Sequence, residues 1–150
     1  MARTLEGNLI ELAKANQFDA IIHGCNCLCQ MGKGIALTIK NTWPEAYEAD
    51  LRTIKGNRNK LGSYSSAWTG SFYIINAYTQ YAYNDPTGQP LADLNAIRMA
   101  MRAIKQDFSG LKLAYPLIGA GLAGGDWREI YPIILQELQG EDHTLISFPS

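Results

Sequence analysis

The sequence predicts an α/β protein, a three-layer α/β/α sandwich on a mixed sheet. Short apolar runs typical of strands alternate with segments of helical periodicity, which favours strands connected by helices. One pair of strands follows without a helix between them, as in a hairpin, so the sheet is expected to be mixed. Two strands run through glycine-rich turns directly into helices, at 19–40 and 111–138. Ligands of such sheets bind beyond the carboxyl ends of the strands, where both turns lie.

The first half of the chain predicts two strands and two helices. In chain order we expect a strand at 3–6, a short segment of unassigned type at 9–13, a strand at 19–25, helices at 35–43 and 45–54, and a solvated basic loop at 55–60. The run at 19–25 is apolar and rich in β-branched residues, as in a buried strand. Pro44 disfavours helical backbone at Trp43, so it ends the first helix and can open the second.

The second half predicts a hairpin, two helices and two further strands. The expected elements are strands at 62–68 and 71–78, a loop at 79–90, a helix at 91–108, a strand at 111–117, a helix at 127–138 and a strand at 144–148. The helix at 91–108 has apolar residues three and four positions apart, and Gly140 ends the last helix. The loop at 79–90 contains Tyr81 and Tyr83; it covers the mouth of a site or is only a surface connection.

Length and composition predict a single domain over residues 1–150. Hydrophobic residues make up 47% and charged residues 18%, and no apolar run approaches the roughly 18 residues of a membrane span. Residues 1–6 lack the apolar core of a signal peptide, so we expect a cytoplasmic location and no membrane partner. The formal net charge of −1 gives no global reason to bind a nucleic-acid polymer. Phosphate recognition is therefore expected to be local and built from backbone donors.

The three cysteines alternate in one segment, as Cys25, Cys27 and Cys29. Their odd number and close spacing argue against a disulfide framework. No second cysteine cluster completes a set of four zinc ligands with His23, so we expect no metal and no cofactor. Packing of small residues is the expected role of the cysteines.

The two glycine-rich turns have the layout of anion-binding corners. A turn at the carboxyl end of a strand offers bare N–H groups, and the following helix adds its unpaired N–H groups and positive dipole end. One such turn also fits an ordinary connection in any α/β protein. Two of them, at 26–34 and 118–126, indicate two phosphates, or a phosphate and a sugar.

These residues resemble a known family. The string Ile-His-Gly-Cys-Asn-Cys at 22–27, the run at 32–36, the run at 118–122 and Trp127 look like those of a macrodomain, the ADP-ribose-binding α/β/α module. The similarity covers essentially the whole chain. Within the family, the His-x-Cys-Asn-Cys string, Trp-Pro-Glu-Ala at 43–46 and Gly7-Asn8 resemble the branch typified by the yeast ADP-ribose 1″-phosphate phosphatase.

The resemblance implies ligand contacts for a set of matched positions. They are Asn8, Leu9, Ile22, Asn26, Gly32, Lys33, Gly34, Ile35, Gly119, Ala120, Gly121 and Leu122. Asn8 lies where the family reads the adenine amino group, usually with a carboxylate, and its side-chain oxygen can still accept that hydrogen bond. Asn26 lies where the family holds the distal ribose, and the two glycine turns lie against the diphosphate. Lys33 replaces a small residue and adds a cation near a phosphate or points to water.

His23 and Asp126 are the candidate catalytic residues. His23 lies near the end of the central strand beside the first turn, titrates near neutral pH, and matches the histidine thought to be catalytic in the yeast-type enzyme. The alternative is a structural histidine bonded to backbone. Asp126 directly follows the second turn and either orients His23 or a water molecule, or caps the helix that starts at Trp127.

The expected function is binding of ADP-ribose with hydrolysis of ADP-ribose 1″-phosphate to ADP-ribose and phosphate. The alternatives are a non-catalytic reader of ADP-ribose and a hydrolase that removes ADP-ribose from protein or nucleic acid. Expected partners are therefore ADP-ribose, its 1″-phosphate and ADP-ribosylated macromolecules. A related branch cleaves ADP-ribose from glutamate with a lysine and an aspartate, and Gln80 and Ala123 occupy those positions here. The resemblance thus argues against the lysine-adduct mechanism of that branch.

Overall fold

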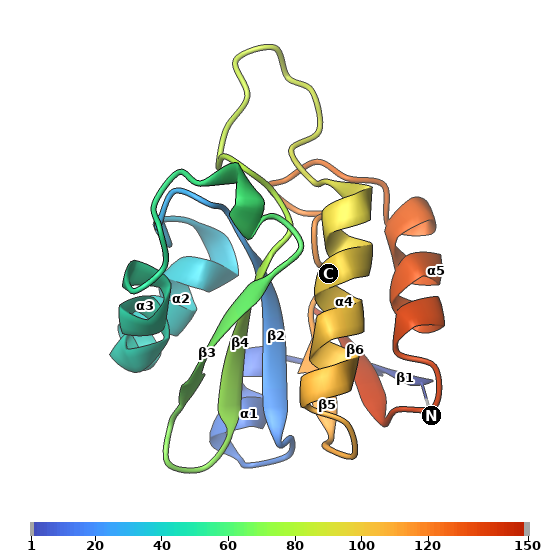
Figure 1. Ribbon diagram of the computed structural model, residues 1–150. Helices are drawn as coiled ribbons and strands as arrows, with labels where there is room; N and C mark the ends of the chain where they lie inside the picture. Colours follow the sequence, from blue (N-terminus) through green and yellow to red (C-terminus); the bar gives the residue numbers. More distant parts are fainter. Residues whose placement is uncertain (1, 149–150) are drawn as a thin grey trace.

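A six-stranded mixed sheet forms the centre of the structure, a computed structural model that describes residues 2–148 (Figure 1). The strands are β1 (Ala2–Glu6), β2 (Ala20–Cys25), β3 (Tyr64–Trp68), β4 (Tyr73–Tyr78), β5 (Leu113–Tyr115) and β6 (His143–Ser147). Their order is β1-β6-β5-β2-β4-β3, and all neighbours are parallel except β3 and β4, which form the predicted hairpin.

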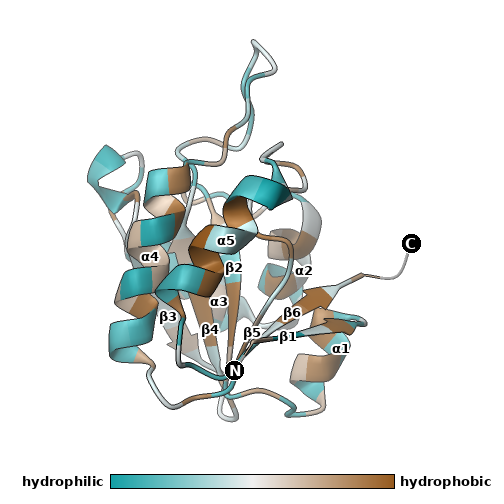
Figure 2. Ribbon diagram, turned by 90° about the vertical axis from the view of Figure 1, so that its right-hand side faces the viewer, coloured by the Kyte–Doolittle hydropathy of each residue, from teal (hydrophilic) through white to brown (hydrophobic). Residues whose placement is uncertain are grey.

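Helices cover both faces of the sheet, so the three-layer α/β/α fold is confirmed. They are α1 (Leu9–Lys14), α2 (Gly34–Thr42), α3 (Pro44–Leu51), α4 (Leu94–Asp107) and α5 (Trp127–Glu137), with a 3₁₀ turn, η1 (Arg58–Lys60). Figure 2 shows α4 and α5 on one side of the sheet and α1 and α2 on the other. Each face has its own apolar cluster, and the consecutive residues Ile21 and Ile22 of β2 belong to different clusters. No helix within residues 2–148 combines the length and apolar content needed to cross a bilayer.

The central strand β2 lies at the point where the chain switches direction across the sheet. It pairs with β4 along its whole length and with β5 at Ala20 and Ile21. After β2 the chain crosses over through α2 and α3 and forms the hairpin of β3 and β4 on one side of β2. Strands β5, β6 and β1 lie on its other side. Ligands of open α/β sheets bind at such a point, beyond the carboxyl ends of the strands. The turns that follow β2 and β5 are therefore neighbours in space.

Several element boundaries differ from the predicted ones for identifiable reasons. The unassigned segment after Asn8 is helix α1, because the Asn8 side chain accepts hydrogen bonds from two N–H groups of its first turn. Helix α4 begins at Leu94 instead of residue 91, because Asp93 is its N-cap. Strand β5 is shorter than predicted and is followed by Pro116, which has no N–H to donate.

The segment at 55–60 was expected to be a solvated loop, and the segment at 79–90 a loop over the mouth of a site or a surface connection. Lys60 is an exception in the first, because it is only 7% exposed. The second leads from β4 to α4 and projects beyond the rest of the fold at the top of Figure 1. It belongs to the same end of the molecule as the two glycine turns.

Candidate functional site

A cleft of about 940 Å³ lies at the carboxyl ends of the central strands. This volume is in the range of small-molecule sites. The residues lining the cleft are Gly7, Asn8, Leu9, Ile10, Gly24, Cys25, Asn26, Gln30, Gly32, Lys33, Gly34, Ile35, Ala36, Thr38, Gln80, Tyr83, Pro116, Leu117, Ile118, Gly119, Ala120, Gly121, Leu122, Ala123, Ile146 and Phe148. All but one of the twelve ligand-contacting positions implied by the sequence line this cleft. The exception is Ile22, which is fully buried below it.

Asn26 organises the turn that follows β2. Its side-chain oxygen accepts hydrogen bonds from the N–H of Leu28 at 2.9 Å and of Gln30 at 3.4 Å, and its Nδ2 donates to the carbonyl of Gln30 at 2.8 Å. The amide is thus largely used in holding the turn, and one Nδ2 hydrogen remains for a ligand. Asn26 lines the cleft while only 7% exposed, so its position is set by the protein before any ligand arrives.

The first glycine turn ends in a set of unpaired backbone donors at the start of α2. Lys33 is the N-cap and makes no side-chain cap. Within the described chain, the N–H groups of Gly34, Ile35 and Ala36 have no hydrogen-bond partner, as expected for the first turn of a helix. Gly34 has φ = 60°, a left-handed conformation that a glycine adopts without strain. These donors border the cleft, at the positive end of the helix dipole.

The second glycine turn provides a matching set of donors on the facing wall. Its shape is held by the N–H of Gly125, which donates to the carbonyl of Gly119 at 2.7 Å, and by the N–H of Gly124, which donates to Gly121 at 3.0 Å. The N–H groups of Gly121, Leu122 and Ala123 have no partner among residues 2–148.

The two turns meet across the cleft. A Cβ atom added at Gly34 would lie 3.2 Å from Cδ1 of Leu122. The two turns therefore approach each other within one cleft, and the residues that carry the unpaired amides line it, which suits an extended diphosphate.

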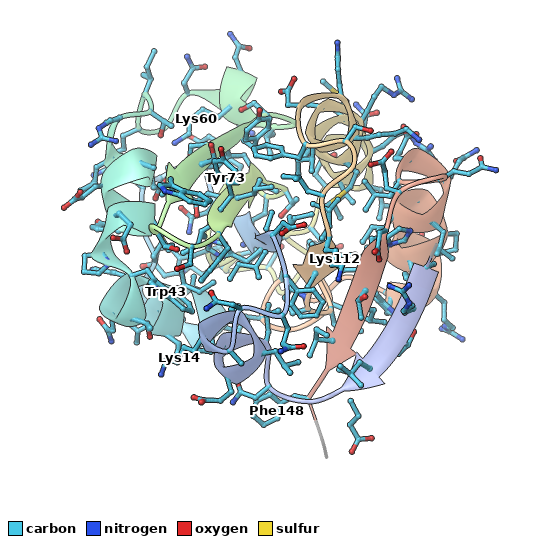
Figure 3. The ribbon with its side chains drawn as sticks, turned by 90° about the horizontal axis from the view of Figure 1, so that it is seen from below. Lys14, Trp43, Lys60, Tyr73, Lys112 and Phe148 are labelled. Atoms are coloured by element: carbon cyan, nitrogen blue, oxygen red, sulfur yellow. The ribbon has the colours of Figure 1, made fainter. Side chains whose placement is uncertain are left out.

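The end of the cleft beside β1 is largely apolar. It is lined by Leu9, Ile10, Ile146 and Phe148, and Phe148 is 72% exposed. Figure 3 shows Phe148 just beyond the end of β6 and next to α1. An exposed aromatic ring over apolar side chains suits a flat heterocycle. The sequence analysis missed Phe148, although an aromatic residue directly after the last strand is a usable signal.

The opposite end is polar and carries one cation. Gln80 and Tyr83 reach it from the loop after β4, and Lys33 Nζ lies 5.6 Å from the centre of the Tyr83 ring. Gln80 Nε2 donates to the carbonyl of Ala82 at 2.7 Å. Among the described lining residues there is no carboxylate and no imidazole. The ionisable side chains of the cleft are Cys25, Lys33 and Tyr83.

The three cysteines are buried, and none of them forms a disulfide bond. Burial raises the pKa of the Cys25 thiol well above its usual value. Cys25 is therefore a neutral thiol at physiological pH and a poor nucleophile, although it lines the cleft. No cluster of three or more His, Cys, Asp or Glu side chains in residues 2–148 could hold a metal ion.

One buried and one partly buried side chain support the first turn by hydrogen bonds to its carbonyl groups. Lys60 Nζ donates to the carbonyl of Cys27 at 3.2 Å, and the Tyr47 hydroxyl donates to the carbonyl of Cys29 at 3.0 Å. Cys29 has φ = 55°, a conformation that is uncommon for a residue with a side chain. The sequence reading of Lys60 as solvated surface was wrong, because this ammonium group is a structural donor to the turn.

The structure does not bring His23 to the cleft. His23 is 0% exposed, on the face of β2 covered by α3, and it is absent from the lining. Its Nε2 lies 2.6 Å from Oδ1 of Asn76, whose Nδ2 donates to the carbonyl of Ala46. Because Oδ1 can only accept, Nε2 carries the proton. The position is that of a structural histidine, although its partner is a side chain and not the backbone.

Asp126 also lies outside the cleft. Its carboxylate accepts a hydrogen bond from the N–H of Arg128 and pairs with the guanidinium of the same residue at 3.1 Å. These hydrogen bonds lower the pKa of Asp126. Of the two roles considered from the sequence, the geometry is that of the N-cap of α5, and nothing connects Asp126 to His23.

His23 makes folding depend on pH. Burial lowers its pKa from 6.5 to about 4, opposed in part by the hydrogen bond to Asn76. The unfolded chain therefore binds a proton between pH 6.5 and 4 that the folded chain does not, so stability falls as the pH is lowered through this window. We expect the free energy of unfolding to decrease by up to roughly 3 kcal/mol from this group.

Urea unfolding of the wild type and of His23→Gln at pH 7 and pH 4.5 measures this contribution. The variant should lose less stability between the two pH values. His143, whose pKa burial also lowers, remains in both proteins, so the difference isolates His23. Equal losses in the two proteins would contradict the assignment.

The comparisons with known proteins agree with this geometry. The model of the Macro domain family matches residues 22–134. An uncharacterized 17.5 kDa protein of Enterobacteria phage T4, from the tk-vs intergenic region, is 32% identical over 89% of this chain and 88% of its own. A DNA ADP-ribosyl glycohydrolase of Mycobacterium tuberculosis is 27% identical over 81% of this chain but 35% of its own. An ADP-ribose 1″-phosphate phosphatase of Ajellomyces capsulatus is 35% identical over 43% of this chain and 23% of its own. The chain thus spans only part of either enzyme.

Solved structures show the same fold at low sequence identity. The macrodomain of M. tuberculosis DarG has a TM-score of 0.76 and 23% identity, covering 100% of this chain and 98% of that one. Thermosipho africanus DarTG, solved in complex with ADP-ribose, has a TM-score of 0.69 and 19% identity, covering 89% of this chain and 38% of that one. With the family model matching most of the sequence, the chain belongs to the Macro domain family.

Proposed function

We propose that the cleft binds ADP-ribose in one orientation. The diphosphate lies between the two glycine turns, the base lies at the apolar end beside Phe148, and the distal ribose lies at the polar end beside Asn26. The observation that carries the proposal is that two sets of unpaired N–H groups belong to turns that line one cleft and approach each other there. The Thermosipho relative solved with ADP-ribose supports it.

The reaction that we propose at the polar end is hydrolysis of ADP-ribose 1″-phosphate. Water would attack the phosphorus atom of the 1″-phosphate, the bond from phosphorus to the oxygen on C1″ would break, and that leaving oxygen would take up the proton that the water loses. The negative charge that develops needs positioned donors. Lys33 supplies the cationic side chain of the described lining, and the N–H of the neighbouring Gly34 is unpaired, so we assign these two donors to the phosphate. The similarity to the Ajellomyces phosphatase supports this reaction. His23 and Asp126 lie outside the cleft and take no part in this chemistry.

Two specific observations favour other functions of the same cleft. The described lining contains no carboxylate and no imidazole to act as a general base, which favours a non-catalytic reader of ADP-ribose. The similarity to DNA ADP-ribosyl glycohydrolases favours removal of ADP-ribose from DNA. Gln80 and Ala123 both line the cleft. They occupy the positions where the glutamate-cleaving branch has its lysine and aspartate, so this cleft lacks both of those side chains.

A bulky residue at Gly121 should abolish binding without unfolding the domain. Nothing lies within 4 Å of a Cβ atom added there, so the protein accommodates it, and because Gly121 lines the cleft we expect the added side chain to take space that the diphosphate needs. We expect Gly121→Val to weaken ADP-ribose binding by more than about ten-fold by calorimetry, with Gly121→Ala intermediate. Asn59→Val, in an exposed segment outside the cleft, serves as the control. Unchanged affinity in Gly121→Val at an unchanged melting temperature would refute the diphosphate position.

Lys33→Gln tests the proposed reaction. If the ammonium group stabilises the transferred phosphate, the variant should release phosphate from ADP-ribose 1″-phosphate at least about ten-fold more slowly, with a smaller change in affinity for ADP-ribose. The measurement is free phosphate against time at saturating substrate. Tight ADP-ribose binding by the wild type, without release of phosphate, would contradict the proposed phosphatase activity and favour the non-catalytic reader of ADP-ribose. Release of ADP-ribose from modified DNA would select the glycohydrolase.

A further inference from the structure

The two ends of the Asn8 side-chain amide have different environments. Its Oδ1 accepts hydrogen bonds from the N–H of Ile10 at 2.9 Å and of Glu11 at 3.2 Å. An amide oxygen has two acceptor positions, and the cap of α1 uses both. Because both partners are N–H donors, only the oxygen can face them, so the orientation of the amide follows from its contacts.

The other end of the amide is free to meet a ligand. Nδ2 makes no hydrogen bond to any residue in 2–148, and Asn8 lines the cleft. The sequence-based expectation was that the Asn8 oxygen accepts a hydrogen bond from the adenine amino group. The cap leaves no acceptor position for that bond, so Asn8 offers the base a donor.

Asn8 has the polar side chain among the lining residues of 7–10 and 146–148. The remaining lining residues from 7–10 and from 146–148 are Gly7, Leu9, Ile10, Ile146 and Phe148, none of which has a polar side chain. Stacking on an aromatic ring tolerates any base, because every base has a π face. Among these residues, discrimination by side chains therefore rests on Asn8 Nδ2. The hydroxyl of Thr38, which also lines the cleft, can both donate and accept and so rejects neither base.

We infer that Asn8 makes this cleft accept 6-oxopurine nucleotides, of the inosine or guanosine diphosphate ribose type, as readily as ADP-ribose. The inference rests on the proposed function of the cleft. The 6-position of adenine carries a donor, whereas that of a 6-oxopurine carries an acceptor. An amide N–H₂ group can donate to a ring nitrogen of adenine or to O6 of hypoxanthine, so it does not reject the second base. A carboxylate in its place would accept from the amino group and repel O6.

Asn8→Asp is a matched test of this residue. Aspartate caps helices as well as asparagine does, so one oxygen keeps the two bonds to α1 and the fold is retained. The second oxygen replaces Nδ2, so a single-atom exchange turns the free donor into an acceptor. The variant should therefore acquire a preference for adenine.

Calorimetric titration with ADP-ribose and inosine diphosphate ribose measures the effect. For the wild type we expect affinities within about three-fold of each other, and for Asn8→Asp a shift of at least about ten-fold toward ADP-ribose. Phe148→Ala should weaken both ligands equally, because stacking does not distinguish them.

A wild-type preference for ADP-ribose above about ten-fold would overturn the inference, and so would an unchanged ratio in a folded Asn8→Asp. The ratio of the two affinities in the wild type tests the inference even if Asn8→Asp fails to fold. A wild type that binds neither nucleotide contradicts the proposed function itself, which separates the two failures.

Discussion

Parallel pairing of β2 with β5 is the constraint on which the cleft depends. The two strands are far apart in the sequence, but they are neighbours in the sheet and run in the same direction. Their carboxyl ends consequently lie side by side, and each continues into a glycine turn with unpaired N–H groups. In the proposed complex, the diphosphate lies between the two turns and meets donors that the fold already holds in place.

Polar groups buried under the cleft hold one of these turns in place. Lys60 supports the turn after β2, and His23 and Asn76 connect β2 and β4 to α3. Buried polar groups are costly unless they are paired, and most of these are. Asp50 Oδ2 and Thr79 Oγ1 are unpaired among the described residues. Thr79 lies so close to Gly24 that a Cβ added there would come within 2.7 Å of its hydroxyl, which explains a glycine at the end of a buried strand.

The sequence predicted the fold and most of the cleft, but not the direction of individual side chains. Apolar periodicity and proline positions placed nearly every element, and both glycine turns were found because their backbone function depends only on small residues between a strand and a helix. The prediction for His23 was wrong because strand periodicity shows only that His23 and Ile22 lie on opposite faces of the sheet. It does not show which of the two faces α3 covers. Asp126 stayed ambiguous because a helix cap and a catalytic carboxylate require the same residue type at that position. The sequence could not predict which end of the Asn8 side-chain amide is free for a ligand, because the oxygen is occupied only when residues 9–14 form a helix.

Chemical-shift perturbation of backbone amides tests the central claim most directly, because the unpaired N–H groups are themselves the observed probes. Addition of ADP-ribose to ¹⁵N-labelled protein should move the amide resonances of Gly34, Ile35, Gly121 and Leu122 together, with one saturation curve. Inorganic pyrophosphate should move the same four in the same direction. Shifts confined to one of the two turns, or to residues outside the cleft, would contradict the account.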